Sequence, residues 1–174
     1  SFDQLSPDLL LVLGDRFEIL AGVTSAMIAR IPIAHIHGGE STVGAIDEAI
    51  RHSITKMAWW HFVAADEYRQ RVIQLGEDPK RVFNTGGLGV DTIKKTRLLT
   101  KKELVEKSGI RFAKKNLLIT YHPVTLEKQD SQTQFKALLN VLSELNDTYQ
   151  IFTLPNADSD SRVIIHMIND YVDN

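Results

Sequence analysis

The most informative absence in this chain of 174 residues is cysteine, which does not occur at all. A protein without cysteine has no disulfide framework, no thiolate zinc site and no cysteine nucleophile. Whatever chemistry the protein performs must therefore use oxygen and nitrogen groups.

Charge of one sign and long apolar runs are also scarce. The 20 basic and 22 acidic residues give a formal net charge of −2, so no strong basic field marks nucleic acid as a partner. No apolar stretch approaches the roughly 20 residues of a membrane span, and the first residues lack the pattern of a signal peptide. We therefore expect a cytoplasmic protein that acts on a small molecule, with neither a nucleic-acid nor a membrane partner.

What is present is a regular alternation of short apolar strands and amphipathic helices. The first apolar run, Leu9 to Leu13, has no polar alternation, which predicts a strand buried on both faces of a parallel sheet. The segment from Phe17 to Arg30 then shows apolar residues at helical spacing. Further strands are expected at 31–36, 59–65, 82–83, 116–121 and 149–154, and further helices at 45–57, 66–75, from 91, 100–107, 131–145 and from 159.

This pattern predicts an α/β fold with two Rossmann-like units, whose sheets are parallel because crossover connections are right-handed. Charged residues become dense between about 94 and 115, which favours a linker there. We expect 1–97 to be the later part of an N-terminal domain, 98–114 a linker, and 115–174 the first part of a C-terminal domain. Each sheet has too few strands to look complete, so we expect the chain to be a piece of a longer protein.

Four polar clusters follow predicted strands, and parallel strands bring their carboxyl ends to one edge of a sheet, where ligands bind. Several titratable groups converging on such an edge are typical of an active site, whereas structural caps would be scattered over both ends. The clusters are Gly14-Asp15-Arg16, the run from His35 to Glu40, the run from Tyr121 to Thr125, and the run from Pro155 to Asp158.

Each cluster also has a structural interpretation. Asp15 can be the N-cap of the following helix. His35 and His37 alternate on a strand and should point to the same face, and one of them can serve only to satisfy buried backbone groups. Gly38 and Gly39 can do no more than permit a turn with positive φ.

The helix at 45–57 adds a further pair, since Asp47 and Arg51 lie four residues apart on one flank. A solvated ion pair is the commoner meaning of this spacing. Glu48 and His52 share the opposite face and are expected to lie on the surface.

No metal and no cofactor is expected. His35, His37 and Glu40 could in principle be ligands, but no helical His-x-x-x-His motif supports them. The glycines of 86–89 do not have the spacing of a dinucleotide-binding loop.

Taken together, four segments resemble the UDP-N-acetylglucosamine 2-epimerase family, and its hydrolysing branch most closely. The resemblance implies two Rossmann-like domains arranged as in the B-type glycosyltransferase fold, with a UDP-sugar in the cleft between them. Family members eliminate UDP across C1 and C2 to give a 2-acetamidoglucal, and the hydrolysing branch adds water to release N-acetylmannosamine for sialic acid synthesis. The segments are Gly14 to Glu18, His35 to Glu40, Gly44 to Ala58, and His122 to Thr125.

The resemblance also implies the site residues. Many relatives carry a catalytic glutamate where this chain has His37, with Glu40 three residues later, so either can take that acid/base role. A homo-oligomer is expected for the full-length protein. The remaining acid/base positions are Asp15, Asp47 and His122, and the implied substrate contacts are Arg16, Arg51 and Asn156.

Two alternatives stay open at this point. A UDP-sugar glycosyltransferase would share the fold, and a folded piece without catalytic activity would share the sequence pattern. The exact sugar is also open, because related enzymes process UDP-diacetamido-trideoxyhexoses. We expect the 174 residues alone to bind UDP weakly and to turn over little or nothing.

Overall fold

The computed structural model describes residues 2–123, 131–156 and 161–173. The chain divides into two compact units, Ser1–Thr96 and Arg97–Asn174, and each has its own sheet and its own apolar core. Within the described residues, no helix is both long enough and apolar enough to cross a membrane.

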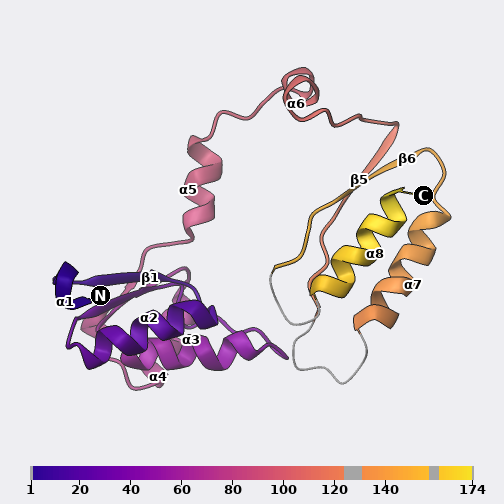
Figure 1. Cartoon of the computed structure of the whole chain (residues 1–174). Coiled ribbons are helices and arrows are strands. Elements are labelled where there is room, and N and C mark those ends of the chain that lie inside the picture. The colour runs from indigo at the N-terminus through magenta and orange to yellow at the C-terminus, as the bar shows by residue number, and fades with distance from the viewer. Residues whose placement is uncertain (1, 124–130, 157–160, 174) are drawn as a thin grey trace. The chain divides into compact units, whose positions relative to one another are not determined.

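The N-terminal unit is built on a four-stranded parallel sheet with the order β1-β2-β3-β4 (Figure 1). Its strands are β1 (Leu10–Leu13), β2 (Ile33–Ile36), β3 (Trp60–Val63) and β4 (Val82–Asn84). Its helices are α1 (Phe2–Leu5), α2 (Phe17–Ile28), α3 (Ile46–Met57), α4 (Asp66–Gln74) and α5 (Leu88–Lys95), with a short 3₁₀ turn, η1 (Pro79–Arg81). The predicted parallel α/β architecture is therefore confirmed.

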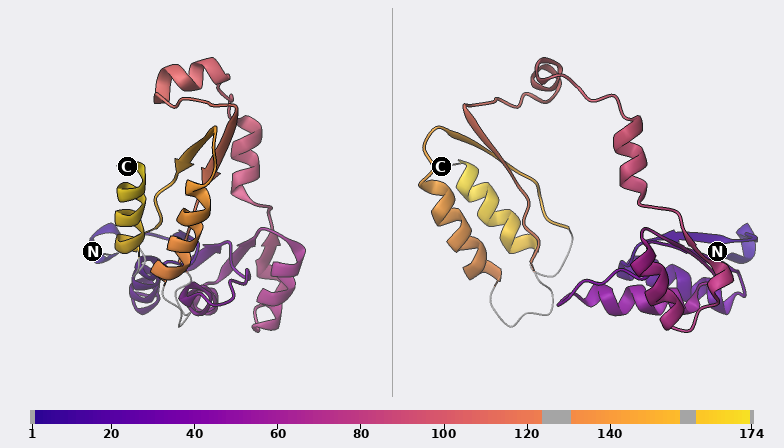
Figure 2. Two further views of the ribbon diagram at one scale, coloured as in Figure 1. Left: turned by 90° about the vertical axis from the view of Figure 1, so that its right-hand side faces the viewer. Right: turned by 180° about the vertical axis from the view of Figure 1, so that it is seen from behind.

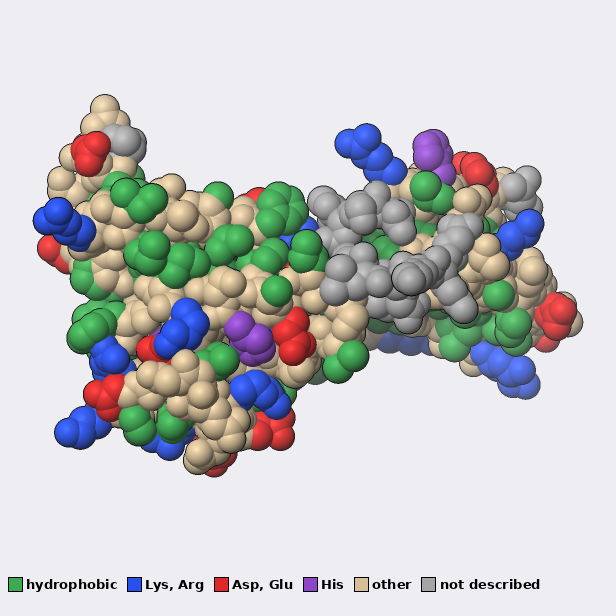
Figure 3. Space-filling view, turned by 90° about the horizontal axis from the view of Figure 1, so that it is seen from below, with side chains coloured by type: hydrophobic (Ala, Val, Ile, Leu, Met, Phe, Trp, Pro, Cys, Tyr) green, Lys and Arg blue, Asp and Glu red, His purple; other side chains and the backbone are tan. Residues whose placement is uncertain are grey.

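Helices α2, α3 and α4 all lie on one face of this sheet (Figures 1 and 2). Most residues of the apolar stripes predicted for the first two helices lie in its main core, where Val23, Ile50 and Ile54 pack with Ala26 of α2 and Ile33 of β2. Met27 and Ile46, also predicted for these stripes, are instead 47% and 51% exposed. Figure 3 shows the side of the unit that carries these helices, on which a band of hydrophobic side chains adjoins a region of mixed acidic, basic and histidine side chains. A smaller core joins α4 to β3 and β4 through Val63, Val72 and Val82.

The opposite face of the sheet is open to solvent in the described residues. Leu10 and Val12 pack against the core, but Leu11 and Leu13 are 59% and 50% exposed. The expectation that the first strand is buried on both faces is therefore wrong for this chain, because the three helices that pack on the sheet share one side. We call the apolar surface left on the other side the open sheet face; it holds a shallow hollow of about 480 Å³ lined by Leu9, Leu11, Ala34, Trp60, Phe62 and Phe83.

The C-terminal unit is built on a parallel pair of strands, and two helices pack side by side on it (Figures 1 and 2). Its elements are α6 (Lys101–Ser108), β5 (Lys115–Ile119), α7 (Ser131–Ser143), β6 (Thr148–Phe152) and α8 (Ser161–Asp173). The core beneath the helices consists of Phe135, Leu139, Leu142, Ile164 and Ile168. Helix α6 lies inside the segment 98–114 that the sequence predicts to be a linker.

Candidate active site

Two turns leave the carboxyl edge of the N-terminal sheet side by side, one after β1 and one after β2. The backbone N–H of Gly14 donates to the carbonyl of Ile36 (3.1 Å), and that of His37 donates to the carbonyl of Phe62 (2.9 Å). Gly14 and His37 both adopt positive φ, at +86° and +65°. Such a φ is uncommon for a residue other than glycine, so His37 turns sharply where the strand ends.

Arg51 of α3 joins these turns to the helix. Its side chain is only 5% exposed and forms an ion pair with Asp15, 36 residues away in the sequence. The same guanidinium donates to the backbone carbonyl of Glu40 (2.9 Å) and to Oγ1 of Thr42 (2.9 Å). The interpretation of Arg51 as part of a solvated ion pair is therefore wrong. The Arg51 side chain is buried, and it links α3 to the turn after β1 and to the loop after β2.

Asp15 and Asp47 approach the site from different elements. Asp15 is not the N-cap of α2, because Arg16 occupies that position and makes no capping hydrogen bond. Asp47 lies half-buried in the first turn of α3, one helical turn before Arg51. Arg16 itself forms an ion pair with Glu18 (3.7 Å).

His37 and Glu40 form one hydrogen-bonded pair, with 2.8 Å between Nδ1 and Oε1. Their side chains are 24% and 33% exposed, so solvent and small molecules reach them. A histidine oriented by a carboxylate is a common arrangement for proton transfer near neutral pH. His37 and Glu40, either of which could take the acid/base role implied by the resemblance, are thus in contact with each other.

His35 has a different environment from His37. It is fully buried, with Nε2 2.8 Å from the carbonyl of Gly14 and Nδ1 3.2 Å from Oγ1 of Thr55. Burial lowers the pKa of His35 from 6.5 to about 4. Its role as a histidine that satisfies buried groups is confirmed, whereas the strand alternation does not extend to His37 because β2 ends at Ile36.

The two glycines that follow His37 are required by close packing, and Gly39 is required by the turn as well. Gly39 has φ of +81°, and a Cβ there would lie 2.4 Å from the carbonyl oxygen of Tyr68. Gly38 does not have positive φ, but a Cβ there would lie 3.0 Å from Oγ1 of Thr55 and 3.1 Å from Nδ1 of His35. The loop therefore lies tightly against both α3 and α4.

Glu48 is a structural residue of the site that sequence reasoning assigned to the surface. It accepts hydrogen bonds from the Ser41 hydroxyl (2.9 Å) and the Thr42 backbone N–H, and these bonds, Ser41 first, lower the pKa of its carboxyl. His52 lies 3.8 Å away on the next turn. The pair of hydroxyl residues just before the helix was the available sequence signal, since such residues commonly bond to groups in a first helical turn.

The C-terminal unit carries the other predicted residues at the carboxyl edge of its own strands. His122 follows β5 and Asn156 follows β6, and both are exposed. The two strand exits are joined by a hydrogen bond between the hydroxyls of Thr120 and Thr153 (2.7 Å). Thr125 and Asp158, which belong to the predicted clusters, lie outside the described residues.

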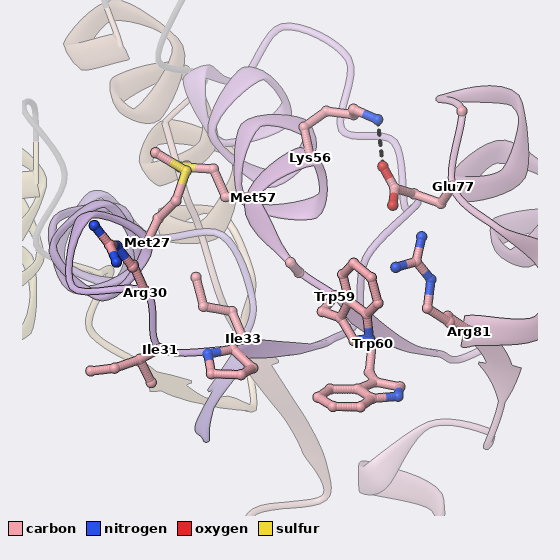
Figure 4. A pocket seen from close by; sticks show the side chains of 13 residues that line it. Met27, Arg30, Ile31, Ile33, Lys56, Met57, Trp59, Trp60, Glu77 and Arg81 are labelled. Carbon is pink, nitrogen blue, oxygen red and sulfur yellow. Dashed lines mark hydrogen bonds and ion pairs between the residues drawn. The ribbon is translucent and has the colours of Figure 1, made fainter. Parts of the chain in front are cut away.

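A separate cavity of about 550 Å³ lies at the starts of β2 and β3, away from the edge that carries Asp15 (Figure 4). Lys56 and Glu77 form an ion pair there, and the Arg81 guanidinium stacks 3.7 Å from the ring centre of Trp59. Its location differs from that of the predicted site. In the part of the chain that the structure describes, no group of three or more His, Cys, Asp or Glu side chains is arranged to hold a metal ion.

Solved structures share this fold. The co-structure of S. aureus MnaA with UDP superposes with a TM-score of 0.71 at 22% identity, over 97% of this chain and 45% of that one. The UDP-GlcNAc 2-epimerase of Methanocaldococcus jannaschii, solved with UDP-GlcNAc and UDP, gives a TM-score of 0.72 at 16% identity, over 97% of this chain and 48% of that one. The neighbours have the fold predicted from the sequence, which is like that of the B-type glycosyltransferases.

Curated relatives are more similar in sequence. The GDP/UDP-N,N'-diacetylbacillosamine 2-epimerase (hydrolyzing) of Campylobacter jejuni is 43% identical over 98% of this chain and 44% of its own length. The UDP-N,N'-diacetylbacillosamine 2-epimerase (hydrolyzing) of Legionella pneumophila is 36% identical over 99% of this chain and 45% of its own length. The chain thus spans less than half the length of these relatives.

The sequence as a whole matches one family model. The UDP-N-acetylglucosamine 2-epimerase model aligns with all 174 residues. The chain therefore belongs to the UDP-N-acetylglucosamine 2-epimerase family.

Proposed function

We propose that the protein containing this chain is a hydrolysing UDP-sugar 2-epimerase. It eliminates UDP from a UDP-2-acetamido sugar and adds water to the unsaturated sugar, with inversion at C2. The hydrolysing assignment is supported by the Campylobacter and Legionella relatives, which are 43% and 36% identical and are named as hydrolysing enzymes. With UDP-N-acetylglucosamine the products are N-acetylmannosamine and UDP.

The observation that carries the proposal is the clustering of Asp15, Arg51, His37 and Glu40 at one sheet edge. Elimination requires a base that takes the C2 proton while the C1–O bond breaks and its electron pair leaves with the UDP phosphate. Hydration then bonds the water oxygen to C1 and returns a proton to the opposite face of C2. Two acid/base groups near one ring carbon and nearby cations meet these needs.

Each residue has a proposed role. His37 acts as an acid/base through Nε2, because its Nδ1 is hydrogen-bonded to Glu40, which orients the ring. Asp15, held by Arg51, and Asp47 are the carboxylate acid/base groups. His122 is the acid/base group from the second unit, and Arg16 and Asn156 contact the nucleotide-sugar.

The sugar is proposed at the level of its class. The named substrates of relatives include N,N'-diacetylbacillosamine as well as N-acetylglucosamine, and the 2-acetamido group is common to both. UDP-N-acetylglucosamine and UDP-N,N'-diacetylbacillosamine should therefore be assayed side by side, and the ratio of their kcat/KM values identifies the preferred sugar.

The test is UDP release by the product of the longest reading frame that contains this chain, hereafter the full reading frame, without an acceptor sugar. In D₂O, we expect UDP release together with one deuterium at C2 of the freed sugar. UDP release only in the presence of an acceptor sugar would instead identify a glycosyltransferase.

Single variants of the full reading frame test the residues. Asp15→Asn, Asp47→Asn and His122→Ala should each lower kcat by about 100-fold or more, as expected for loss of an acid/base group, with the far-UV spectrum unchanged. Glu67→Gln, at an exposed position of α4, is the matched control and should keep full activity. A variant of Asp15 that retains wild-type kcat would remove that residue from the mechanism.

The 174 residues alone are proposed to be folded but nearly inactive, because they match less than half of the relatives' length. Turnover by this chain equal to that of the full reading frame would contradict this. A cytoplasmic location and a homo-oligomeric state of the full-length protein belong to the same proposal.

A further inference from the structure

His35 lies at the centre of a buried hydrogen-bonded chain that runs from the turn after β1 to helix α3. Its Nε2 contacts the carbonyl of Gly14 (2.8 Å), and its Nδ1 contacts Oγ1 of Thr55 (3.2 Å). Oγ1 of Thr55 in turn lies 3.0 Å from the carbonyl of Arg51. This series of hydrogen bonds therefore connects Gly14, the residue before Asp15, with Arg51, the residue that forms the ion pair with Asp15.

The number of available protons determines how this chain is bonded. The carbonyls of Gly14 and Arg51 can only accept, so three contacts need three protons, while a neutral histidine and one hydroxyl supply two. The Arg51 carbonyl already accepts the backbone N–H of Thr55 within the helix, so it needs the hydroxyl least. The shortest contact, from Nε2 to the Gly14 carbonyl, therefore takes the ring proton, and the Thr55 hydroxyl donates to Nδ1, so the contact left without a proton is the one between Oγ1 of Thr55 and the Arg51 carbonyl.

The surroundings favour a neutral ring. His61 of β3 is the register partner of His35, and the charged groups that act on the His35 ring are Arg51 and Asp15. His61 and Arg51 oppose a positive charge on His35, and Asp15 favours one. Desolvation outweighs all of these effects and lowers the pKa of His35 to about 4, so the ring is neutral at pH 7.

We propose that His35 is a positioning residue of the active site. As the neutral Nε2–H tautomer it ties the Gly14 carbonyl to α3, and this tie keeps Asp15 in contact with Arg51. The ring transfers no proton during the reaction. The effect on turnover rests on the proposed function, whereas the tautomer and the tie are properties of the folded chain.

Two substitutions separate the two nitrogens. The side-chain amide of glutamine reaches about as far as Nε2, and that of asparagine about as far as Nδ1. His35→Gln can therefore still donate to Gly14, and His35→Asn can bond only toward Thr55. If the tie to Gly14 matters, glutamine rescues the site and asparagine does not.

The first measurement uses the 174-residue chain and needs no activity. Nitrogen-15 correlation spectra, with His35→Gln to identify the resonance among the six histidines, should show a protonated Nε2 and a bare Nδ1 at pH 7. Exchange of the Gly14 amide proton, which bonds to Ile36, should stay slow in His35→Gln and become faster in His35→Asn. An Nδ1–H tautomer, a charged ring, or equal exchange in both variants would overturn the proposal.

The second measurement is UDP release by the full reading frame. His35→Asn should lower kcat by about 30- to 100-fold with a smaller change in KM, as expected when a catalytic group is displaced, and His35→Gln should stay within about threefold of the wild type. Ile54→Val, a core change on α3, is the control for destabilisation alone and should leave kcat unchanged. Equal loss in both His35 variants, or loss of one limb of the pH–rate profile in His35→Gln, would overturn the positioning role.

If the unchanged full reading frame releases no UDP from any sugar, the proposed function fails. The tautomer and amide-exchange measurements still decide whether His35 makes the tie.

Discussion

Burial sets the charge of His35 and, through it, the acid stability of the N-terminal unit. The pKa of His35 is about 4 in the folded chain against an ordinary value of 6.5, and burial also lowers the pKa of His61. Between these two pH values the unfolded chain binds a proton that the folded chain does not. The free energy of unfolding should therefore be highest above pH 6.5 and fall as the pH drops toward 4, by about 3 kcal/mol from His35.

Urea unfolding at several pH values checks this, with fluorescence of the chain's two tryptophans, Trp59 and Trp60, as a signal from the N-terminal unit alone. His35→Gln should lose the part of the slope between pH 6.5 and 4 that His35 contributes, while the part from His61 remains. His166→Gln, at an exposed position in the other unit, should leave the slope unchanged. A slope in His35→Gln equal to that of the unchanged chain would assign the acid sensitivity to other groups.

Gly39 and Gly14 share positive φ but differ in the space around them. A Cβ at Gly39 would lie 2.4 Å from the backbone oxygen of Tyr68 and 2.8 Å from Cγ2 of Val72, whereas a Cβ at Gly14 would meet nothing within 4 Å. Gly14→Ala should cost about 1 kcal/mol of unfolding free energy, from backbone strain alone. Gly39→Ala should cost about 3 kcal/mol, because overpacking adds to the strain.

The same tryptophan-monitored urea unfolding measures both glycine variants. A similar loss of unfolding free energy at the two positions would mean that the loop shifts to accommodate the added methyl group, and that its contact with α4 is not tightly packed.

At the scale of elements, most of the fold could be predicted because its signals are local. Apolar runs and helical spacing identified every strand and the helices α2 to α8, with ends displaced by a few residues, while α1 has too few residues to give a periodic signal. The clustering of polar residues at strand exits followed from parallel pairing. The family resemblance implied that Arg51 lies close to Asp15, but residue spacing alone could not predict their contact, because it joins residues 36 apart through a turn whose backbone the sequence does not specify.

Helix α6 owes its N-terminus to a capping box. The Thr100 hydroxyl accepts from the backbone N–H of Glu103, and the Glu103 carboxylate accepts from the backbone N–H of Thr100. The same carboxylate also accepts from the Thr100 hydroxyl (2.9 Å), and the bonds from the Thr100 backbone N–H and hydroxyl, in that order, lower the pKa of the Glu103 carboxyl. Thr100→Ala should return that pKa toward its ordinary value and destabilise the helix by about 1 kcal/mol.

A carboxyl titration followed by NMR, together with amide exchange in α6, measures both effects. Thr100→Ser keeps the hydroxyl and should retain the lowered pKa. An unchanged Glu103 pKa in Thr100→Ala would mean that the backbone N–H bond alone holds the carboxylate.

At the scale of the whole molecule, the parallel sheet of the N-terminal unit is packed, within the described residues, against helices on one face only. Parallel sheets are normally covered on both faces, yet the described helices of the N-terminal unit cover one. The sequence predicted coverage of both faces from the apolar character of the strand residues, and that character is present. The chain matches less than half the length of its curated relatives. Coverage of a sheet face depends on segments far away in the sequence, so the strand residues alone cannot predict whether the face is covered.

The open sheet face predicts how the 174-residue chain behaves by itself. Contiguous exposed apolar surface drives association, so the chain should self-associate at micromolar concentration and bind the dye ANS. Leu11→Lys combined with Phe83→Lys should weaken both effects, measured by sedimentation and dye fluorescence. The urea midpoint should hardly change, because the two side chains are already 59% and 43% exposed.

Val43→Lys gives the matched control, since Val43 is 94% exposed and is not part of the open sheet face. It adds one positive charge, half of what the double variant adds, without removing apolar area from the face, so self-association that falls equally in this variant would be an effect of net charge. If the double lysine variant still associates and binds dye while Val43→Lys does the same, the contact surface lies elsewhere. If only the double variant loses self-association and dye binding, the uncovered side of the sheet, rather than charge or marginal stability, causes the isolated chain to associate.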